Sequence, residues 1–374
     1  MSSGTAVRRI LMTTDAVGGV WTYAIDLCRA LRAHGVEVVL ATMGPLPRSD
    51  QRQEVAALEN VALVESSHRL EWMDNPWDDV ARAGEWLLDL ERSFRPDAIH
   101  LNGYAHGALP WRAPVLIAAH SCVLSWWRAV RGGSPPTEWN RYRDAVRDGL
   151  HGAHLVVAPT RAMLNALQAH YGLLARTVVI PNGRNVPALP RVAKEPFVLS
   201  VGRLWDEAKN AATLARAARG LPWPVRLAGS THAPGNDEQH FEGVELLGTL
   251  PAAELWQHFA RASIYALPAR YEPFGLSVLE AASAGCALVL GDIPSLREVW
   301  GEAALYVPPD DVGQLQHTLR ELITDTDRRH VLAQRALQSA ARYTISRMAE
   351  RYVAAYAQLS RSSPVHGTVA GILA

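Results

Sequence analysis

Short apolar runs alternate with amphipathic segments along almost the whole chain, and a proline-rich segment interrupts this pattern near the middle. Such alternation is typical of βαβ units, which build a parallel sheet covered by helices. The strand-like runs of the first half are residues 9–13, 36–41, 97–101, 115–119, 155–158 and 177–180. Those of the second half are residues 197–201, 225–227, 244–247, 264–267, 287–290 and 305–307. The sequence therefore predicts an α/β protein with two Rossmann-like, doubly wound domains.

The proline-rich interruption marks the predicted domain boundary, because Pro181, Pro187, Pro190 and Pro196 exclude a helix there. We expect a first domain over residues 1–187, a second over 188–343, and a closing helix with a tail over 344–374. Ligands of doubly wound sheets bind outside the carboxyl ends of the strands. The predicted binding site is therefore the central cleft across which the two domains face each other.

Composition narrows the classes of partner and compartment. The 37 basic residues balance 37 acidic ones, which disfavours a nucleic-acid partner. Three widely spaced cysteines support neither a disulfide framework nor a zinc site. The N-terminus lacks the apolar core of a signal peptide, and the longest uncharged stretch of the first half, residues 113–127, is too short to span a bilayer. We expect a cytoplasmic protein, and peripheral contact with the inner membrane face stays open.

The first motif is a glycine pair, Gly18-Gly19, between the first strand and the first helix. Paired glycines let the backbone approach a ligand and leave a helix N-terminus facing it. A dinucleotide site would require G-x-G-x-x-G here and an acid after the second strand, where the chain has Ala41-Thr42. The pattern argues against an NAD or FAD enzyme, and a tight turn without a ligand is the alternative.

The second motif follows the first strand of the second half directly. Arg203 and Lys209 place two cations at the carboxyl end of that strand, beside the start of a helix. This combination suits a diphosphate. The alternative is a solvated helix start in which Asp206 and Glu207 pair with both cations.

The third motif is the segment from Glu272 to Glu280, which follows another predicted strand. Pro273 and Gly275 favour a tight turn whose free amides point at an anion as a helix begins. The two carboxylates would then flank that anion and hold sugar hydroxyls. For Glu280 taken alone, a capping box with Ser277 is the favoured alternative.

These segments together resemble the retaining glycosyltransferases of family four, which have the GT-B fold. Glu272-Pro-Phe-Gly-Leu-Ser-Val-Leu-Glu280 looks like the E-x7-E motif of that family. The resemblance covers nearly the whole chain and includes Gly18-Gly19, His120, Pro181-Asn182-Gly183, Gly202-Arg203-Leu204 with Lys209, and the closing helices. It implies that the second domain binds a nucleotide-sugar donor, that the first binds most of the acceptor, and that the closing helix returns toward the first domain.

The resemblance also implies roles for single residues. Arg203 and Lys209 would neutralise the donor diphosphate, Glu272 would contact the transferred sugar, and Glu280 would hold the ribose hydroxyls. His120 would reach the sugar at the reaction centre, although a lone histidine after a strand is equally often structural. The other donor-binding residues expected are Gly18, Gly19, Gly202, Leu250, Phe274, Gly275, Leu276 and Ser277. The sequence departs from the family pattern at Ser121 and Asn210.

Candidate acceptor-binding residues follow strands of the first half. Trp126 and Trp127, in a predicted loop after His120, offer flat apolar faces to a sugar ring, with Arg131 to hold hydroxyls or phosphates. Asn102, Tyr104 and His106, just past the strand that ends at residue 101, are further candidates. The acceptor class stays open among a polysaccharide, a lipid-linked glycan and a small molecule.

No metal or other cofactor is expected. Metal-dependent sugar transfer uses an Asp-x-Asp pair, and Asp325-Thr326-Asp327 lies in a helix-rich stretch where capping explains it better. The resemblance implies a metal-independent transfer that retains the anomeric configuration by front-face attack. UDP, GDP and ADP donors all remain open, as do two other functions of the same fold, an epimerase or hydrolase of nucleotide-sugars and a non-catalytic binding protein.

Overall fold

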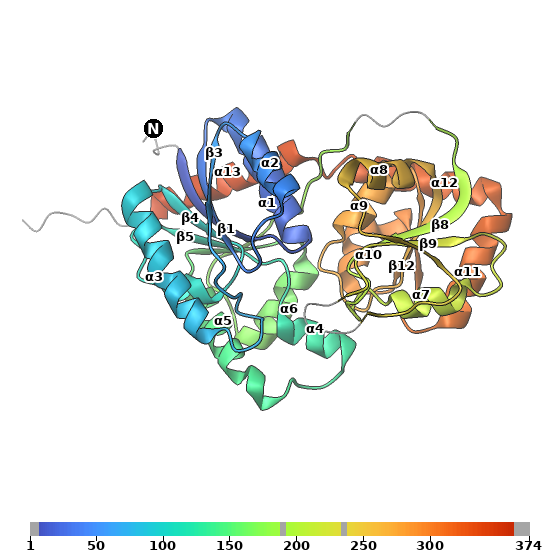
Figure 1. The fold of residues 1–374 in the computed structure, drawn as a ribbon, viewed down its shortest axis with the longest axis horizontal. Coiled ribbons are helices and arrows are strands. Elements are labelled where there is room, and N and C mark those ends of the chain that lie inside the picture. Colours follow the sequence, from blue (N-terminus) through green and yellow to red (C-terminus); the bar gives the residue numbers. More distant parts are fainter. Residues whose placement is uncertain (1–6, 188–191, 233–237, 363–374) are drawn as a thin grey trace, which may run out of the picture.

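The computed structural model describes residues 7–187, 192–232 and 238–362, with side chains up to residue 359. It contains two α/β lobes, each built around its own parallel sheet (Figure 1). The predicted fold class is confirmed. The boundary expected between residues 187 and 188 falls at the edge of segment 188–191, which lies outside the described residues, and so does most of the expected tail, residues 363–374.

The first sheet has seven parallel strands in the order β3-β2-β1-β4-β5-β6-β7. Its strands are β1 Arg9–Asp15, β2 Glu37–Met43, β3 Val61–Glu65, β4 Ala98–Leu101, β5 Val115–Ala118, β6 Leu155–Ala158 and β7 Thr177–Val179. Its helices are α1 Gly19–Leu31, α2 Ser49–Ala56, α3 Trp77–Phe94, α4 Val123–Val130, α5 Asn140–Gly152 and α6 Arg161–Tyr171.

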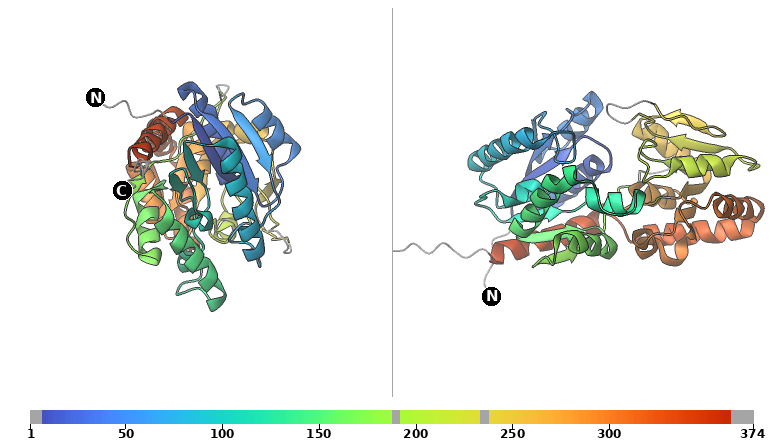
Figure 2. Two further views of the ribbon diagram at one scale, coloured as in Figure 1. Left: turned by 90° about the vertical axis from the view of Figure 1, so that its left-hand side faces the viewer. Right: turned by 90° about the horizontal axis from the view of Figure 1, so that it is seen from below.

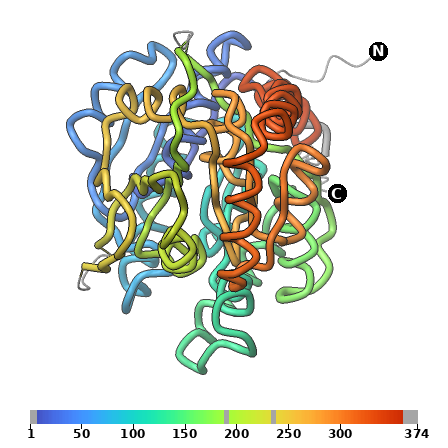
Figure 3. The backbone as a smooth tube through the Cα atoms, turned by 90° about the vertical axis from the view of Figure 1, so that its right-hand side faces the viewer, coloured from blue at the N-terminus to red at the C-terminus, as the bar shows by residue number. Residues whose placement is uncertain are grey.

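The second sheet has six parallel strands in the order β10-β9-β8-β11-β12-β13. Its strands are β8 Glu195–Val201, β9 Val225–Ala228, β10 Glu245–Gly248, β11 Ala262–Leu267, β12 Ala287–Gly291 and β13 Leu305–Val307. Its helices are α7 Ala211–Ala218, α8 Ala252–Arg261, α9 Leu276–Ser283, α10 Pro294–Trp300, α11 Val312–Thr324 and α12 Thr326–Ala340. Figure 3 shows this domain from its outer side.

Helices cover both faces of each sheet, so both faces of a central strand are buried and its sequence is a nearly continuous apolar run. Every residue of β5 and β11 is buried, as expected for strands in the middle of a parallel sheet. In α1 the apolar residues Ala24, Leu27 and Leu31 face the core at helical spacing. The 3-10 turn that follows α1 ends at Gly35, whose φ of 65° is readily adopted only by glycine.

The last helix, α13 Ile345–Ser362, leaves the second domain and packs against the first (Figures 1 and 2). Met348, Tyr352 and Tyr356 of α13 are buried in the same apolar cluster as Tyr23 of α1. His100 of β4 lies between the two helices, with Nδ1 2.6 Å from Tyr356 Oη and Nε2 3.3 Å from Tyr23 Oη. Burial lowers the pKa of His100 to about 3, so this core network is neutral at physiological pH.

The sequence predicted every strand of the structure except β3, and one local expectation was wrong. The edge strand β3 is short and mostly half-exposed, so its apolar pattern is weak. Trp126 and Trp127 lie in helix α4, not in a loop. Cys122 caps this helix, because its sulfur accepts a hydrogen bond from Ser125 N at 3.3 Å. An unusual capping residue of this kind is difficult to recognise in a sequence.

The three cysteines are buried free thiols. Among the described residues, no helix is both long enough and apolar enough to cross a membrane.

Candidate active site

The glycine loop after β1 lies against the second domain. Gly18 has a φ of 79°, and a Cβ atom built on it would lie 3.4 Å from Arg203 Nη1. A Cβ atom on Gly19 would lie 3.6 Å from Leu276 Cδ1, at the start of α9. The structure therefore brings together the three segments that the sequence selected, with the Gly18-Gly19 backbone between the Arg203 loop and the N-terminus of α9.

Lys209 and Glu272 form an ion pair in the donor half of this site. Lys209 Nζ lies 2.5 Å from Glu272 Oε2, and both side chains are largely buried. The other carboxylate oxygen of Glu272 accepts a hydrogen bond from Gly275 N at 2.9 Å. Glu272 thus fixes the turn that precedes α9 and also holds the lysine, so the two residues reach one point from separate loops.

Arg203 is the second cation of the site. Its Nη2 donates to Asp206 at 2.9 Å, and its guanidinium carbon lies 5.4 Å from the ring centre of Trp205. Its Nε is buried and has no hydrogen-bond partner among the described residues. Burial would raise the pKa of Asp206, but the nearby Lys209 and Arg203 charges hold it below its usual range. Of the alternative of a solvated helix start, only the pair Arg203–Asp206 is present, and its carboxylate is buried, whereas Lys209 pairs with Glu272.

Glu280 does not cap α9, so the capping-box alternative is wrong. Its Oε1 instead accepts from Arg184 Nε at 2.6 Å, and Arg184 Nη1 lies 2.7 Å from Asp26 Oδ2 of α1. The Ser277 hydroxyl accepts a hydrogen bond from Tyr265 at 2.8 Å. Burial raises the pKa values of Glu280 and Asp26, and the Arg184 charge opposes this rise in both. Arg184 thus joins the two domains at the carboxylate that the family resemblance assigns to the ribose.

His120 lies on the first-domain side of the cleft in a fixed orientation. Asn102 donates its side-chain amide to Thr13 O at 2.7 Å, which leaves Asn102 Oδ1 to accept from His120 Nε2 at 2.8 Å. The imidazole therefore carries its proton on Nε2 and keeps Nδ1 as an acceptor. Burial lowers the pKa of His120 to about 4, so the ring is neutral at physiological pH.

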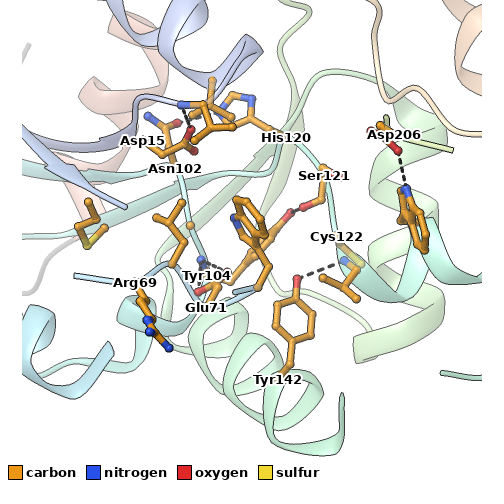
Figure 4. Close-up of a pocket in the computed structure, with 18 of the residues that line it drawn as sticks. Asp15, Arg69, Glu71, Asn102, Tyr104, His120, Ser121, Cys122, Tyr142 and Asp206 are labelled. Carbon is orange, nitrogen blue, oxygen red and sulfur yellow. Dashed lines mark hydrogen bonds between the residues drawn. The ribbon is translucent and has the colours of Figure 1, made fainter. Parts of the chain in front are cut away.

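A cavity of about 640 Å³ opens beside His120, with walls from both domains (Figure 4). The predicted acceptor residues that line it are Asn102, Tyr104, His106, Trp126 and Trp127. The residues from the predicted donor set that line it are His120 and Arg203. Its volume is typical of a small-molecule site. The sequence thus selected a group of residues that the fold gathers around one space.

The other predicted residues lie outside this lining. Arg131 instead pairs with Glu207 of the second domain at 2.5 Å. Phe274 is buried against Tyr343, and Leu250 follows the edge strand β10. Gly202 lies against Lys209, since a Cβ atom on Gly202 would be 3.6 Å from Lys209 Cγ.

Several lining residues escaped the sequence analysis. Asp15 ends β1 and accepts a hydrogen bond from Val17 N at 2.7 Å. Glu71 is buried and accepts from Tyr104 N and Ala105 N at 3.0 and 2.7 Å. Trp72, Trp139 and Trp205 also face the cavity. Asp15 could have been selected from the sequence, because it is a carboxylate at the end of the first strand. The tryptophans could not, because no local motif distinguishes those that line a cavity from those that fill a core.

Asp15→Asn should stabilise the protein at high pH. Burial raises the pKa of Asp15 to about 6, from 3.8, so ionised Asp15 destabilises the folded state. Removing this charge should raise the free energy of unfolding by about 3 kcal/mol at pH 8 and by roughly half as much at pH 5, because the benefit decreases as wild-type Asp15 becomes protonated. Urea denaturation at the two pH values measures the difference. A gain that is equal at both pH values, or a loss at pH 8, would contradict it.

Contacts across the cleft hold the domains together. Trp126 Nε1 donates to Asp206 at 3.0 Å, and Cys122 N donates to the Tyr271 hydroxyl at 3.2 Å. The carboxylate of Glu298 in α10 accepts hydrogen bonds at 2.6 and 2.8 Å from two amides at the start of α6. A carboxylate at a helix N-terminus is favourable because it accepts hydrogen bonds from free amides and lies at the positive end of the helix dipole.

Asp325 has a structural role. It is the N-cap of α12, and its side chain accepts a hydrogen bond from Arg328 N at 2.9 Å, as the capping interpretation of the Asp-x-Asp pair predicted. Within the described parts of the chain, no group of three or more His, Cys, Asp or Glu side chains is arranged to hold a metal ion.

Comparison with known proteins agrees with this geometry. Residues 17–186 match the family described as Glycosyltransferase Family 4, and residues 183–339 match Glycosyl transferases group 1. Glycogen synthase of Mycobacterium tuberculosis is 27% identical over 85% of this chain and 86% of its own length. Among solved structures, sucrose-phosphate synthase of Thermosynechococcus elongatus has a TM-score of 0.79 at 19% identity and covers 95% of this chain and 100% of its own.

The Anabaena protein HepE, solved with UDP and glucose, has a TM-score of 0.71 at 16% identity, over 94% of this chain and 100% of its own. The two family matches follow each other and together extend over both domains. The chain therefore belongs to glycosyltransferase family 4 and is a glycosyltransferase with the GT-B fold.

Proposed function

We propose that this glycosyltransferase moves a sugar from a nucleoside-diphosphate sugar to an acceptor hydroxyl, without a metal ion and with retention of the anomeric configuration. The observation that carries the proposal is that the Gly18-Gly19 loop lies against Arg203 and the N-terminus of α9, and that Lys209 pairs with Glu272 in the turn before this helix. Two cations and a helix N-terminus suit a departing diphosphate, whose negative charge increases as the bond to the sugar breaks.

In the mechanism we propose, donor binding rearranges the Lys209–Glu272 pair. The diphosphate takes the ammonium of Lys209, which frees a carboxylate oxygen of Glu272 for the hydroxyls of the transferred sugar. Glu280, held by Arg184 in the free protein, accepts hydrogen bonds from the ribose. His120 is neutral and can approach the cationic sugar in the transition state without electrostatic repulsion.

The acceptor attacks from the same face that the diphosphate leaves. A departing phosphate oxygen accepts the proton of the attacking hydroxyl, so no separate protein base is required. NMR of the first product formed from an α-linked donor should show an α-linked sugar. A first product with inverted configuration would overturn the front-face mechanism and leave the transferase assignment intact.

Product analysis with and without an acceptor separates this function from its alternatives. A transferase gives free nucleoside diphosphate and a glycosylated acceptor. An epimerase or hydrolase would instead consume the donor equally fast without an acceptor. A non-catalytic binding protein would bind the nucleotide and give no product in either reaction.

Transfer should continue in excess EDTA. We expect Arg203 and Lys209 to balance the diphosphate charge that a metal ion balances in metal-dependent transferases. Initial rates before and after dialysis against EDTA should agree within about twofold. Complete loss of transfer that magnesium restores would contradict a metal-independent reaction.

A further inference from the structure

Five tryptophans line the cavity beside His120: Trp72, Trp126, Trp127, Trp139 and Trp205. They belong to separate segments, since Trp72 precedes α3, Trp126 and Trp127 lie in α4, Trp139 precedes α5, and Trp205 belongs to the second domain. This is five of the twelve tryptophans in the chain. Tyr104 and Tyr142 add two further aromatic rings to the same lining.

Most of these indoles keep their N–H groups free. Trp126 Nε1 donates to Asp206. The N–H groups of Trp72, Trp127, Trp139 and Trp205 make no hydrogen bond to the described part of the protein, and none of them is a buried, unsatisfied donor. An indole that is half-buried and uses no N–H in the fold offers a ligand both an apolar face and a hydrogen-bond donor.

Carboxylates outnumber cations in the same lining. The lining contains four acidic residues, Asp15, Glu71, Asp206 and Glu207, against two arginines, Arg69 and Arg203. The two histidines of the lining, His106 and His120, are neutral because burial lowers the pKa of each. The formal balance of the lining is therefore negative.

Both arginines already have partners in the protein. Arg203 pairs with Asp206 and belongs to the proposed diphosphate site. Arg69 donates from Nη1 to Asp74 O at 2.8 Å and lies 3.7 Å from Asp79, and its side chain is 53% exposed. An acceptor phosphate or carboxylate in this space would lose water without gaining a dedicated cation, and it would meet like charge.

The carboxylates are equally committed to the fold. Both Glu71 oxygens accept backbone N–H groups, and the Asp206 oxygens accept from Arg203 and from Trp126. Glu207 pairs with Arg131. None of these three carboxylates is therefore free to anchor a cationic acceptor. The principal surface that the lining offers to a ligand is its exposed aromatic faces.

We propose, on the basis of the function proposed above, that the acceptor is an uncharged ring compound that stacks an apolar face on these indoles, and that phosphorylated or carboxylated acceptors are excluded. Both the C–H face of a sugar ring and an aromatic aglycone have this chemistry. The cavity volume of about 640 Å³ accommodates a small glycoside or the end of a neutral glycan.

Calorimetric titration of the full chain tests this inference with matched neutral and anionic probes. The probes are phenyl β-glucoside and maltose, each beside its 6-phosphate, with methyl β-glucoside as reference. We expect each neutral probe to bind at least tenfold more tightly than its phosphate. The proposal would be overturned if either 6-phosphate bound as tightly as its neutral counterpart or more tightly. It would also be overturned if neither neutral probe showed saturable binding. If phenyl β-glucoside binds more tightly than methyl β-glucoside, the group that stacks on the indoles is an aromatic aglycone. If maltose binds more tightly than methyl β-glucoside, it is the C–H face of a second sugar ring.

Variants assign the preference to the indoles. Trp139→Ala and Trp72→Ala should each weaken the neutral probes about tenfold, since one aromatic contact contributes up to about 1.5 kcal/mol. Trp223→Ala is the matched control, because Trp223 stacks under Arg329 in the second domain, outside the cavity lining. Trp139→Arg, which adds a cation to the same wall, should narrow the neutral-to-phosphate ratio. Unchanged affinity in both alanine variants would refute the role of the indoles.

These titrations contain no donor, so they are independent of sugar transfer. Stabilisation of the protein by a nucleoside diphosphate tests the proposed function separately. A protein that binds a nucleoside diphosphate but prefers phosphorylated probes would refute this inference alone, whereas a protein that binds no nucleoside diphosphate would refute the proposed function.

Discussion

Arg184→Met should lower the free energy of unfolding by about 3–5 kcal/mol at pH 8, because it removes one partner of a buried ion-pair network. The Arg184 side chain is 17% exposed and contacts Asp26 and Glu280, whose side chains are 2% and 11% exposed. Without the guanidinium, both carboxylates would remain buried, and Glu280 would lose the cation that pairs with it. The volume of methionine is close enough to keep the packing.

The loss should depend on pH in a defined direction. Burial already raises the pKa values of Asp26 and Glu280, and removing Arg184 raises them further. Protonation then removes the unpaired charges, so the deficit of the variant should shrink as the pH falls from 8 to 5. Chemical denaturation at both pH values measures it. A deficit that is constant with pH would indicate lost packing instead of lost charge.

Arg29→Met is the matched control. Arg29 also pairs with Asp26, at 2.8 Å, but its side chain is 35% exposed and solvent screens the pair. We expect a loss of no more than about 1 kcal/mol. A comparable loss of unfolding free energy in both variants would show that the buried position of Arg184 between the domains adds nothing to stability.

Lys209→Arg should reduce kcat/KM for transfer by about 10²–10³-fold while the protein folds normally, a loss comparable to removing one preorganised donor from an active site. The aliphatic part of the Lys209 side chain lies against Gly202, and its ammonium pairs with Glu272. A guanidinium is planar and larger, so it cannot place one compact charge at the same point. The chain has 35 arginines and only two lysines, which makes a lysine here notable.

Lys194→Arg provides the control for Lys209→Arg. The Nζ of Lys194 donates to Ala284 O at 2.6 Å and to Phe259 O at 3.2 Å. It therefore caps carbonyl groups near two helix ends, away from the cleft. Initial-rate kinetics of both variants should show a large loss for Lys209→Arg alone, and near-normal turnover in that variant would show that the lysine is incidental.

The sequence predicted the fold well because its parallel strands are continuous apolar runs separated by amphipathic helices. The strand β3 was missed because an edge strand needs little apolar surface. The helix that contains Trp126 and Trp127 was missed because a cysteine sulfur, not a usual capping residue, satisfies its first turn.

The site was only partly predictable, since short motifs carry information about local backbone and not about partners distant in sequence. The motifs around Gly18, Arg203 and Glu272 identified segments that the fold does bring together. By contrast, Arg184 reaches Asp26 and Glu280 across 158 and 96 positions. The clustering of the cavity tryptophans likewise depends on how both domains fold.

The most direct test of the account is thermal unfolding of the chain in the presence of UDP, GDP or ADP. One of these nucleotides, at about a hundred times its Kd, should stabilise the protein by roughly 2.7 kcal/mol. Lys209→Arg, folded but unable to hold the diphosphate, should lose most of this shift. If none of the three nucleotides stabilises the folded wild-type protein at millimolar concentration, the proposed diphosphate site at Arg203 and Lys209 is wrong.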